Sequence, residues 1–120
     1  MKIAFTTSGN DLDAPLDSRF GRAPKFIVYE MESGAFEVVD NAKSMNAAQG
    51  AGIQAAETIV RLGASCVMTG HCGPKAFRVL SAAGVKVYSI DAATVSEALD
   101  RFLTERIAPL DSADVEGHHV

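Results

Sequence analysis

The chain has 120 residues, 48% of them hydrophobic and 22% charged, which is the size and composition of a single soluble domain. Its formal net charge of −4 argues against nucleic acid or an anionic membrane as the main partner, because both attract basic surfaces. No apolar run approaches the roughly 20 residues of a membrane span, and residues 1–7 lead into a strand without a signal-peptide core. We therefore expect a cytoplasmic protein whose two cysteines are free thiols.

The first half of the chain predicts three strands and one long loop. Residues 2–8 are an apolar run ending in Ser-Gly-Asn, which indicates a buried strand. Residues 9–24 have no periodicity, and a connection of this length in a small domain is more often functional than not. Residues 26–31 and 35–40 flank Glu-Ser-Gly, a turn sequence that predicts an antiparallel hairpin.

The second half predicts helices that alternate with strands. Residues 47–62 form an amphipathic pattern with four apolar side chains inward: Ile53, Ala56, Ile59 and Val60. Strands are expected at residues 66–69 and 85–90, with a helix at 74–83 between them. A capping box from Thr94 to Glu97 then opens a last helix, whose inward residues would be Val95, Ala98, Leu99, Phe102 and Leu103. Residues 109–120 are acidic and unpatterned, so we expect a disordered tail.

This order of elements predicts an α/β protein with three layers. Right-handed crossovers and the need to cover both faces favour a five-stranded mixed sheet in the order 3-2-1-4-5, with strand 2 antiparallel, as in ribonuclease-H-like folds. The single domain would span residues 1–108. In such sheets ligands bind beyond the carboxyl ends of the strands where the winding direction changes, and this crevice would collect the 9–22 loop and residues 70–73.

His71 and Cys72 are the candidate metal ligands in that crevice. The strand before them breaks at Gly70 and the next helix begins at Pro74, so both residues stand at a helix N-terminus, which favours a thiolate or another anion. From the residues alone, a simple helix-capping role has equal weight. A structural zinc site needs four ligands and is disfavoured, because the second pair of candidate ligands, His118 and His119, lies in the tail.

Cys66 has a different interpretation, because it lies inside an apolar strand. A free cysteine in that setting usually acts as a small buried hydrophobe.

His71, Cys72 and Arg78 also match the His-Cys-x5-Arg spacing of cysteine-dependent phosphatases. A phosphate loop needs successive backbone N–H groups, whereas Pro74 has none and starts the helix early, which places Arg78 on its second turn. We keep this activity as the alternative. A two-metal nuclease is disfavoured more strongly, because neither central strand carries a carboxylate.

The long loop carries Arg19 and Arg22 on either side of Phe20 and Gly21. Loop arginines commonly form a solvated surface that is balanced by nearby aspartates. An aromatic ring and a glycine between two guanidinium groups also suit a polarisable anion such as a sulfide-bridged metal cluster.

Four segments carry a resemblance to a known family. They are Asp-Ser-Arg-Phe-Gly-Arg-Ala-Pro (17–24), Gly-Ala-Gly-Ile-Gln (50–54), Thr-Gly-His-Cys-Gly-Pro-Lys-Ala (69–76) and Ala-Gly-Val-Lys-Val-Tyr (83–88). In this order they resemble the dinitrogenase iron-molybdenum cofactor biosynthesis family over about residues 1–105. The resemblance implies a ribonuclease-H-like fold and a non-catalytic carrier or scaffold for a metal-sulfur cluster. The cluster would be a molybdenum-copper sulfide or an iron-molybdenum type, exchanged with a protein donor or acceptor.

The predicted site combines this resemblance with the expected crevice. Its cofactor-binding residues would be Arg19, Phe20, Gly21, Arg22, Asn46, Gly50, Gly70, His71, Cys72 and Gly73. Of these, His71 and Cys72 would be the metal ligands.

Overall fold

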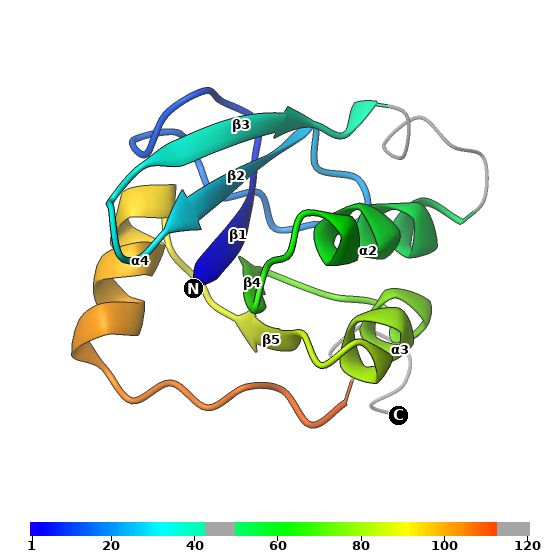
Figure 1. The fold of residues 1–120 in the computed structure, drawn as a ribbon. Coiled ribbons are helices and arrows are strands. Elements are labelled where there is room, and N and C mark those ends of the chain that lie inside the picture. The colour runs from blue at the N-terminus through cyan, green and yellow to red at the C-terminus, as the bar shows by residue number, and fades with distance from the viewer. Residues whose placement is uncertain (43–49, 113–120) are drawn as a thin grey trace.

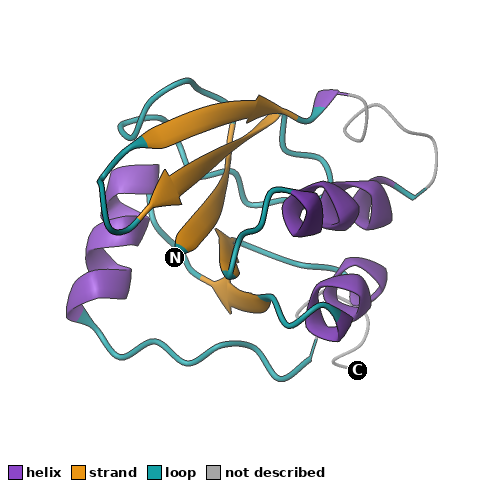
Figure 2. Ribbon diagram, in the orientation of Figure 1, coloured by secondary structure: helices purple, strands orange, loops and turns teal. Residues whose placement is uncertain are grey.

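A computed structural model of the chain describes residues 1–42 and 50–112. Its five strands are β1 (Lys2–Thr7), β2 (Lys25–Glu30), β3 (Phe36–Asp40), β4 (Cys66–Thr69) and β5 (Lys86–Ser89). The helices with described bounds are α2 (Ala51–Arg61), α3 (Pro74–Ala82) and α4 (Val95–Thr104). Figures 1 and 2 show how these elements are arranged around the sheet.

The five strands form one mixed sheet in the order β3-β2-β1-β4-β5. β2 is antiparallel to both β1 and β3, whereas β1, β4 and β5 run parallel. This confirms the predicted α/β fold class, strand order and antiparallel strand, an arrangement consistent with a ribonuclease-H-like fold. The carboxyl ends of β1, β4 and β5 therefore meet at one edge of the sheet.

Each face of the sheet has its own apolar core. α2 and α3 cover one face, and α4 covers the other (Figure 2). In the core under α2 and α3, Ala56 and Leu80 pack with Phe26 and Val67. In the core under α4, Leu99 packs with apolar side chains such as Phe5 and Met68. The separation follows from strand alternation, because successive side chains of β1 point to opposite faces. Both faces are covered by helices, as a largely parallel central sheet requires.

The helix ends follow their sequence signals. Gly63 and Gly84 have φ values of 77° and 79°, a left-handed conformation that ends α2 and α3 and that residues with a side chain rarely adopt. At the start of α4 the Glu97 amide donates to Thr94 Oγ1 at 3.0 Å, which is the threonine half of the predicted capping box. The predicted start of α2 at residue 47 lies outside the described residues.

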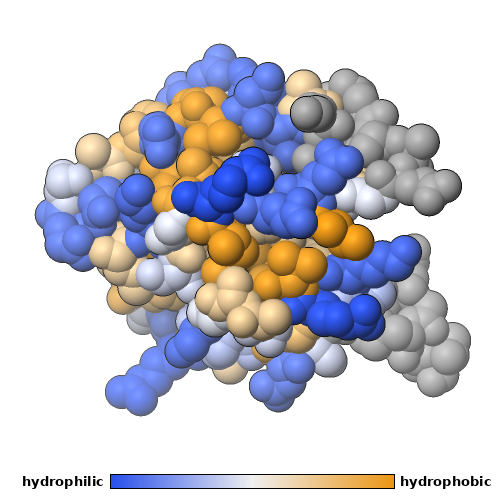
Figure 3. All heavy atoms as spheres, turned by 45° about the vertical axis from the view of Figure 1, so that its right-hand side comes forward, coloured by the Kyte–Doolittle hydropathy of each residue, from blue (hydrophilic) through white to orange (hydrophobic). Residues whose placement is uncertain are grey.

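Two side chains predicted to point inward are exposed instead. Val60 is 38% exposed and Leu103 is 55% exposed. Each directly follows an inward residue, Ile59 or Phe102, and one helical step of about 100° carries it past the edge of the buried stripe. Figure 3 shows apolar surface between hydrophilic side chains on one face of the molecule.

A C-terminal strap, residues 105–112, runs from the end of α4 along β5 toward α3 (Figure 1). The Leu110 amide donates to the Val87 carbonyl at 2.8 Å, and the Leu110 side chain packs against the α2/α3 core. The rest of the predicted tail, including His118 and His119, lies outside the described residues. In the part of the chain that is described, no helix has the length and apolar character needed to cross a membrane.

Candidate functional site

The long loop crosses the carboxyl edge of the sheet as an arch, residues 17–20. The Asp17 amide donates to the Thr6 carbonyl at 2.8 Å, which fastens the arch to the end of β1. Beyond β4, the His71 amide donates to the Ser18 carbonyl at 2.8 Å, and the Phe20 amide donates to the His71 carbonyl at 3.2 Å. The structure thus brings together the two segments that the sequence placed at this edge.

Glycines allow the arch and Gly21, the residue that follows it, to pack directly on their neighbours. A Cβ atom at Gly70 would lie 2.7 Å from Ser18 Cα, and one at Gly21 would lie 2.8 Å from both Cα and N of Gly52. Gly52 in turn packs against Ala76, since its Cβ would be 3.2 Å from the Ala76 Cβ. These contacts join the loop to the first turns of α2 and α3, and we call this junction (residues 19–22, 50–53 and 70–76) the mouth.

Among the described residues, both helices that begin at the mouth have N-termini without a side-chain cap. α2 follows Gly50 and α3 follows Gly73, and neither N-cap residue makes a side-chain hydrogen bond to the helix. The first turn of each helix also lacks an acidic residue. Because the first N–H groups of a helix have no intrahelical acceptor and carry the positive end of its dipole, two such ends create a favourable place for an anion.

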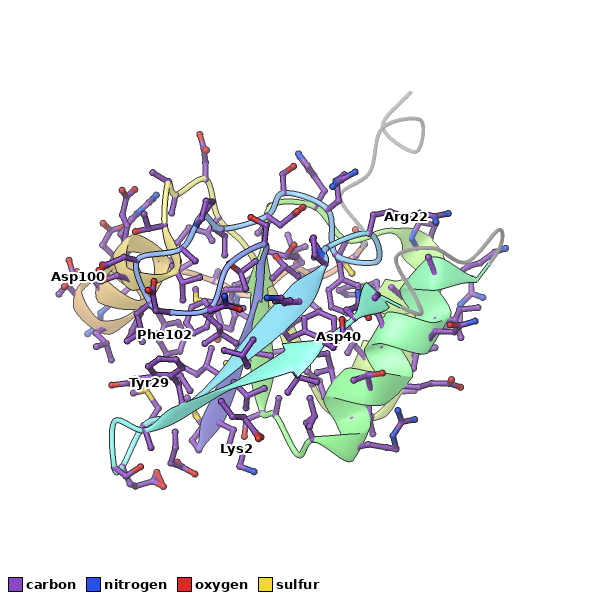
Figure 4. The ribbon with its side chains drawn as sticks, turned by 90° about the horizontal axis from the view of Figure 1, so that it is seen from above. Lys2, Arg22, Tyr29, Asp40, Asp100 and Phe102 are labelled. Carbon is purple, nitrogen blue, oxygen red and sulfur yellow. The ribbon has the colours of Figure 1, made fainter. Side chains whose placement is uncertain are left out.

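The basic side chains of the mouth are exposed. Arg19, Arg22 and Lys75 are all solvent-accessible, as is His71. Figure 4 shows Arg22 near the end of α2 that begins the helix, far from Lys2 at the start of β1. Asp17 orients Arg19, because its Oδ1 accepts from the Arg19 amide at 2.8 Å and lies 3.4 Å from Nε. The Arg19 side chain is 63% exposed, so this ion pair is weak and leaves the guanidinium available to a ligand.

Cys72 and Phe20 are covered rather than presented to solvent. Cys72 has no exposed surface, and its Sγ lies 3.8 Å from the Gly73 carbonyl oxygen. Phe20 is 2% exposed, and its ring centroid lies 5.8 Å from that of Phe26 in the α2/α3 core. The predicted roles of Cys72 as a metal ligand and of Phe20 as a ligand contact therefore stay predictions, and in this conformation both side chains face the core.

Cys66 is the buried hydrophobe that the sequence predicts. It is 3% exposed in the α4-side core, and both cysteines are free thiols. Burial raises the pKa of the Cys66 thiol from its ordinary value of 9.0 to about 11, an effect that the nearby Lys86 opposes. This thiol is therefore protonated at neutral pH and suits a packing role.

The described residues do not form a multidentate metal centre. Within residues 1–42 and 50–112, no group of three or more His, Cys, Asp or Glu side chains is placed to hold a metal ion. Asn46, which the sequence also placed in the site, lies outside these residues.

A hollow lies on the α4 side of the arch, within the predicted crevice, but the contribution of residues 89–92 to it was not predicted. It has a volume of about 390 Å³ and is lined by Leu16, Ser18, Gly70, His71, Ser89, Ile90, Asp91 and Ala92. Ser89 Oγ donates to the Gly70 carbonyl at 2.6 Å, which ties the end of β5 to the end of β4. The available signal was the Ser-Ile-Asp sequence at the end of β5, because the carboxyl ends of parallel strands collect ligand contacts.

Comparisons with family models, protein sequences and solved structures were made over the whole chain, and they agree with one another. The family model described as dinitrogenase iron-molybdenum cofactor matches residues 1–105. An uncharacterised protein of Methanocaldococcus jannaschii is 30% identical over 110 residues, 89% of each chain. The structure is similar to the apo form of the orange protein from Desulfovibrio gigas, with 41% identity, a TM-score of 0.91 and coverage of 95% of this chain and 96% of that one.

A Thermotoga protein solved by NMR has 38% identity, a TM-score of 0.84 and coverage of 97% and 98% of the two chains. These likenesses extend over nearly the whole chain, so the agreement is not confined to one motif. The chain therefore belongs to the dinitrogenase iron-molybdenum cofactor family.

Proposed function

We propose that the protein is a non-catalytic carrier or scaffold for an anionic metal-sulfur cluster, which binds at the mouth. The observation that carries this proposal is the convergence of two open helix N-termini with Arg19 and Arg22 at one edge of the sheet. The hollow on the other side of the arch contains Asp91 and no arginine, so it is the less favourable of the two places for an anion. Family membership supports a cargo of this chemical class.

The cargo that we favour is a molybdenum-copper sulfide cluster, with an iron-molybdenum cluster as the second possibility. Sulfide-bridged clusters of either type are polarisable anions, which match planar guanidinium groups and backbone N–H donors. The 41% identity to the orange protein favours the first type, and the family description favours the second.

The chain would hold this cargo mainly without covalent bonds to it. Arg19, Arg22 and the first-turn N–H groups would supply charge-assisted hydrogen bonds, each contributing on the order of 1.5–3 kcal/mol. His71 is the exposed side chain of metal-ligand type at the mouth, whereas the Cys72 sulfur has no exposed surface. We therefore expect Cys72→Ser to leave the spectrum of a bound cluster unchanged, and a shifted spectrum would assign Cys72 as a ligand.

Anaerobic reconstitution tests the proposed function. The protein is incubated with tetrathiomolybdate and Cu(I), or with tetrathiomolybdate and Fe(II), and then passed through a desalting column. We expect visible charge-transfer absorption and a stoichiometric metal content with one of the two mixtures. A colourless, metal-free product with both mixtures would refute the proposal.

The alternative, a cysteine-dependent phosphatase, lacks support at its nucleophile. Cys72 is completely buried, and Arg78 is exposed on the second turn of α3, where it lines a different hollow together with Asp111 and Ser112. We expect no hydrolysis of an aryl phosphate by the wild-type protein. Sustained hydrolysis that disappears in Cys72→Ser would favour the enzyme instead.

We further propose that the cluster is exchanged with a protein donor or acceptor in the cytoplasm. The net charge of −4 makes nucleic acid or an anionic membrane an unsuitable partner.

A further inference from the structure

Two buried hydroxyl groups lie directly beneath the arch. Thr6 is near the end of β1 and Thr69 is the last residue of β4, and neither has exposed surface. The two strands are parallel neighbours with Phe5 opposite Met68, so the same register places Thr6 opposite Thr69. Their Oγ1 atoms are 2.9 Å apart.

Both hydroxyl groups lie near the same backbone carbonyl of the arch, that of Asp17. Thr6 Oγ1 lies 2.7 Å from the Asp17 carbonyl oxygen, and Thr69 Oγ1 lies 3.5 Å from the same atom. Each hydroxyl has a single proton to donate. The shorter distance assigns the Thr6 proton to the Asp17 carbonyl, and the Thr69 hydroxyl can then donate to Thr6 Oγ1. With the Asp17 amide bound to the Thr6 carbonyl, both backbone groups of Asp17 are fixed by Thr6.

The position of Asp17 in turn determines the positions of residues at the mouth. Its carboxylate accepts from the Arg19 amide at 2.8 Å, and the next residue of the arch, Ser18, accepts from the His71 amide at 2.8 Å. A displaced Asp17 would therefore shift Arg19 and loosen the pairing between the arch and His71. An apolar side chain of the same shape at position 6 would leave the part-buried Asp17 carbonyl without its shorter hydroxyl hydrogen bond.

We propose that Thr6 and Thr69 are positioning residues, a hydroxyl clamp that holds the arch so that Arg19 and His71 are preorganised for an anionic ligand. This inference rests on the proposed function and adds to it two residues that touch neither the solvent nor the cargo. Preorganisation increases affinity because the arch does not have to be ordered when the ligand binds.

The neighbouring Thr7 provides a matched control. It is also completely buried, and its Oγ1 donates to the Pro15 carbonyl at 2.7 Å and accepts from the Gly9 amide at 3.1 Å. Thr7→Val therefore removes equally short hydrogen bonds to the same loop, but upstream of the arch. A general loss of stability should affect both variants, whereas a positioning role belongs to Thr6 and Thr69.

The experiment compares Thr6→Val, Thr69→Val and Thr7→Val, with Thr6→Ser and Thr69→Ser as variants that retain the hydroxyl. Titration with preformed molybdenum-copper sulfide cluster should show about tenfold weaker binding for Thr6→Val and two- to threefold weaker binding for Thr69→Val. Binding should be restored in the serine variants and should stay within about twofold of wild type in Thr7→Val, whose lost contacts do not address Asp17.

Amide hydrogen exchange of the cluster-free protein gives a readout that does not depend on cargo. The amides of Arg19, Phe20 and His71 should exchange faster in Thr6→Val than in Thr7→Val, at equal global stability set with denaturant. Equal exchange in the two variants, or wild-type cluster affinity in Thr6→Val, would overturn the inference. If the wild-type protein bound no cluster, the proposed function would fail, and the exchange comparison alone would decide whether the hydroxyls hold the arch.

Discussion

The N-terminus of α4 differs from the N-termini of α2 and α3 in how the first N–H groups of the helix, which have no intrahelical acceptor, are satisfied. α4 begins with Thr94 as a side-chain cap and has Glu97 in its first turn, so its N-terminal donors and its dipole are partly satisfied internally. α2 and α3 begin after Gly50 and Gly73, with no side-chain cap and no acid in the first turn. Glycine in place of a capping side chain costs only a few tenths of a kcal/mol, and at these two neighbouring helices it leaves backbone donors without a side-chain cap, which an external anion could use. This difference supports the proposed function, in which the mouth would give up local stability for binding.

The largest effect should come from crowding the contact between α2 and Gly21, the residue that follows the arch. Gly21→Ala places a Cβ 2.8 Å from the Gly52 backbone, which cannot move independently of the helix. We expect the free energy of unfolding to fall by about 2–3 kcal/mol and cluster binding to be lost. Urea denaturation and cluster titration measure the two effects.

Gly63→Ala serves as the control for this change. Gly63 lies at the far end of α2 with a φ of 77°, and a Cβ atom added there would meet no other atom within 4 Å. The substitution should cost about 1–2 kcal/mol through backbone strain while binding persists. Cluster loss in both variants would indicate unfolding rather than damage to the mouth.

Removing a guanidinium group should weaken binding without affecting the fold. Arg19→Ala or Arg22→Ala should reduce cluster affinity by roughly ten- to a hundredfold, the value of one charge-assisted hydrogen bond. The midpoint of thermal unfolding should hardly change, because both side chains are exposed. Arg78→Ala, an exposed arginine of α3 outside the mouth, should bind like wild type, and a comparable loss there would mean that the site is misplaced.

The buried thiol of Cys66 allows a test on the face of the sheet that α4 covers. Cys66 in the α4-side core has a pKa raised by burial to about 11, against an ordinary value of 9.0. Well below pH 9 the thiol is protonated in both the folded and the unfolded chain, so it has no effect on the pH dependence of stability. As the pH rises from 9 toward 11 the unfolded chain ionises first, and stability should fall by on the order of 2 kcal/mol.

Cys66→Ala should flatten this alkaline decline relative to wild type. Denaturant unfolding at several pH values between 8 and about 11 compares the slopes, which also removes the shared contribution of tyrosines and lysines. An unchanged slope in Cys66→Ala would assign the decline to other groups.

The smallest effect should come from exchanging the two kinds of helix start. Gly73 has the extended angles φ −72° and ψ 166°, which a residue with a side chain can adopt, so Gly73→Asp should cap α3 and raise stability by a few tenths of a kcal/mol. Its carboxylate should also weaken cluster binding. Thr94→Ala should lower stability by about 1 kcal/mol and leave binding unchanged. Tighter binding in Gly73→Asp would contradict the anionic character of the cargo.

The sheet order and most element boundaries could be predicted because they depend on local patterns and on chain connectivity. Pro74 fixed the start of α3, and Gly63 and Gly84 marked two helix ends. The same patterns placed the loop and residues 70–73 at one edge of the sheet. Helix periodicity was less reliable at the border of a buried stripe, where Val60 and Leu103 turned out to be exposed.

The orientation of side chains at the site could not be predicted in the same way. Phe20 and Cys72 belong to segments that face the mouth, yet their own side chains fill the core beneath it. Thr6 and Thr69 looked like ordinary strand residues, because the Asp17 carbonyl that lies near both hydroxyls comes from a third segment. Contacts among three separate parts of the chain leave no periodic signal in any one of them.

The C-terminal strap has a practical consequence for how this chain can be shortened. The family match ends at residue 105, whereas the Leu110 amide donates to Val87 on the outer strand of the sheet and its side chain covers part of the core. A protein that stopped at residue 105 would present β5 as an uncovered strand edge, a common template for intermolecular pairing. A shortened version that keeps this part of β5 covered should therefore retain the chain through residue 112.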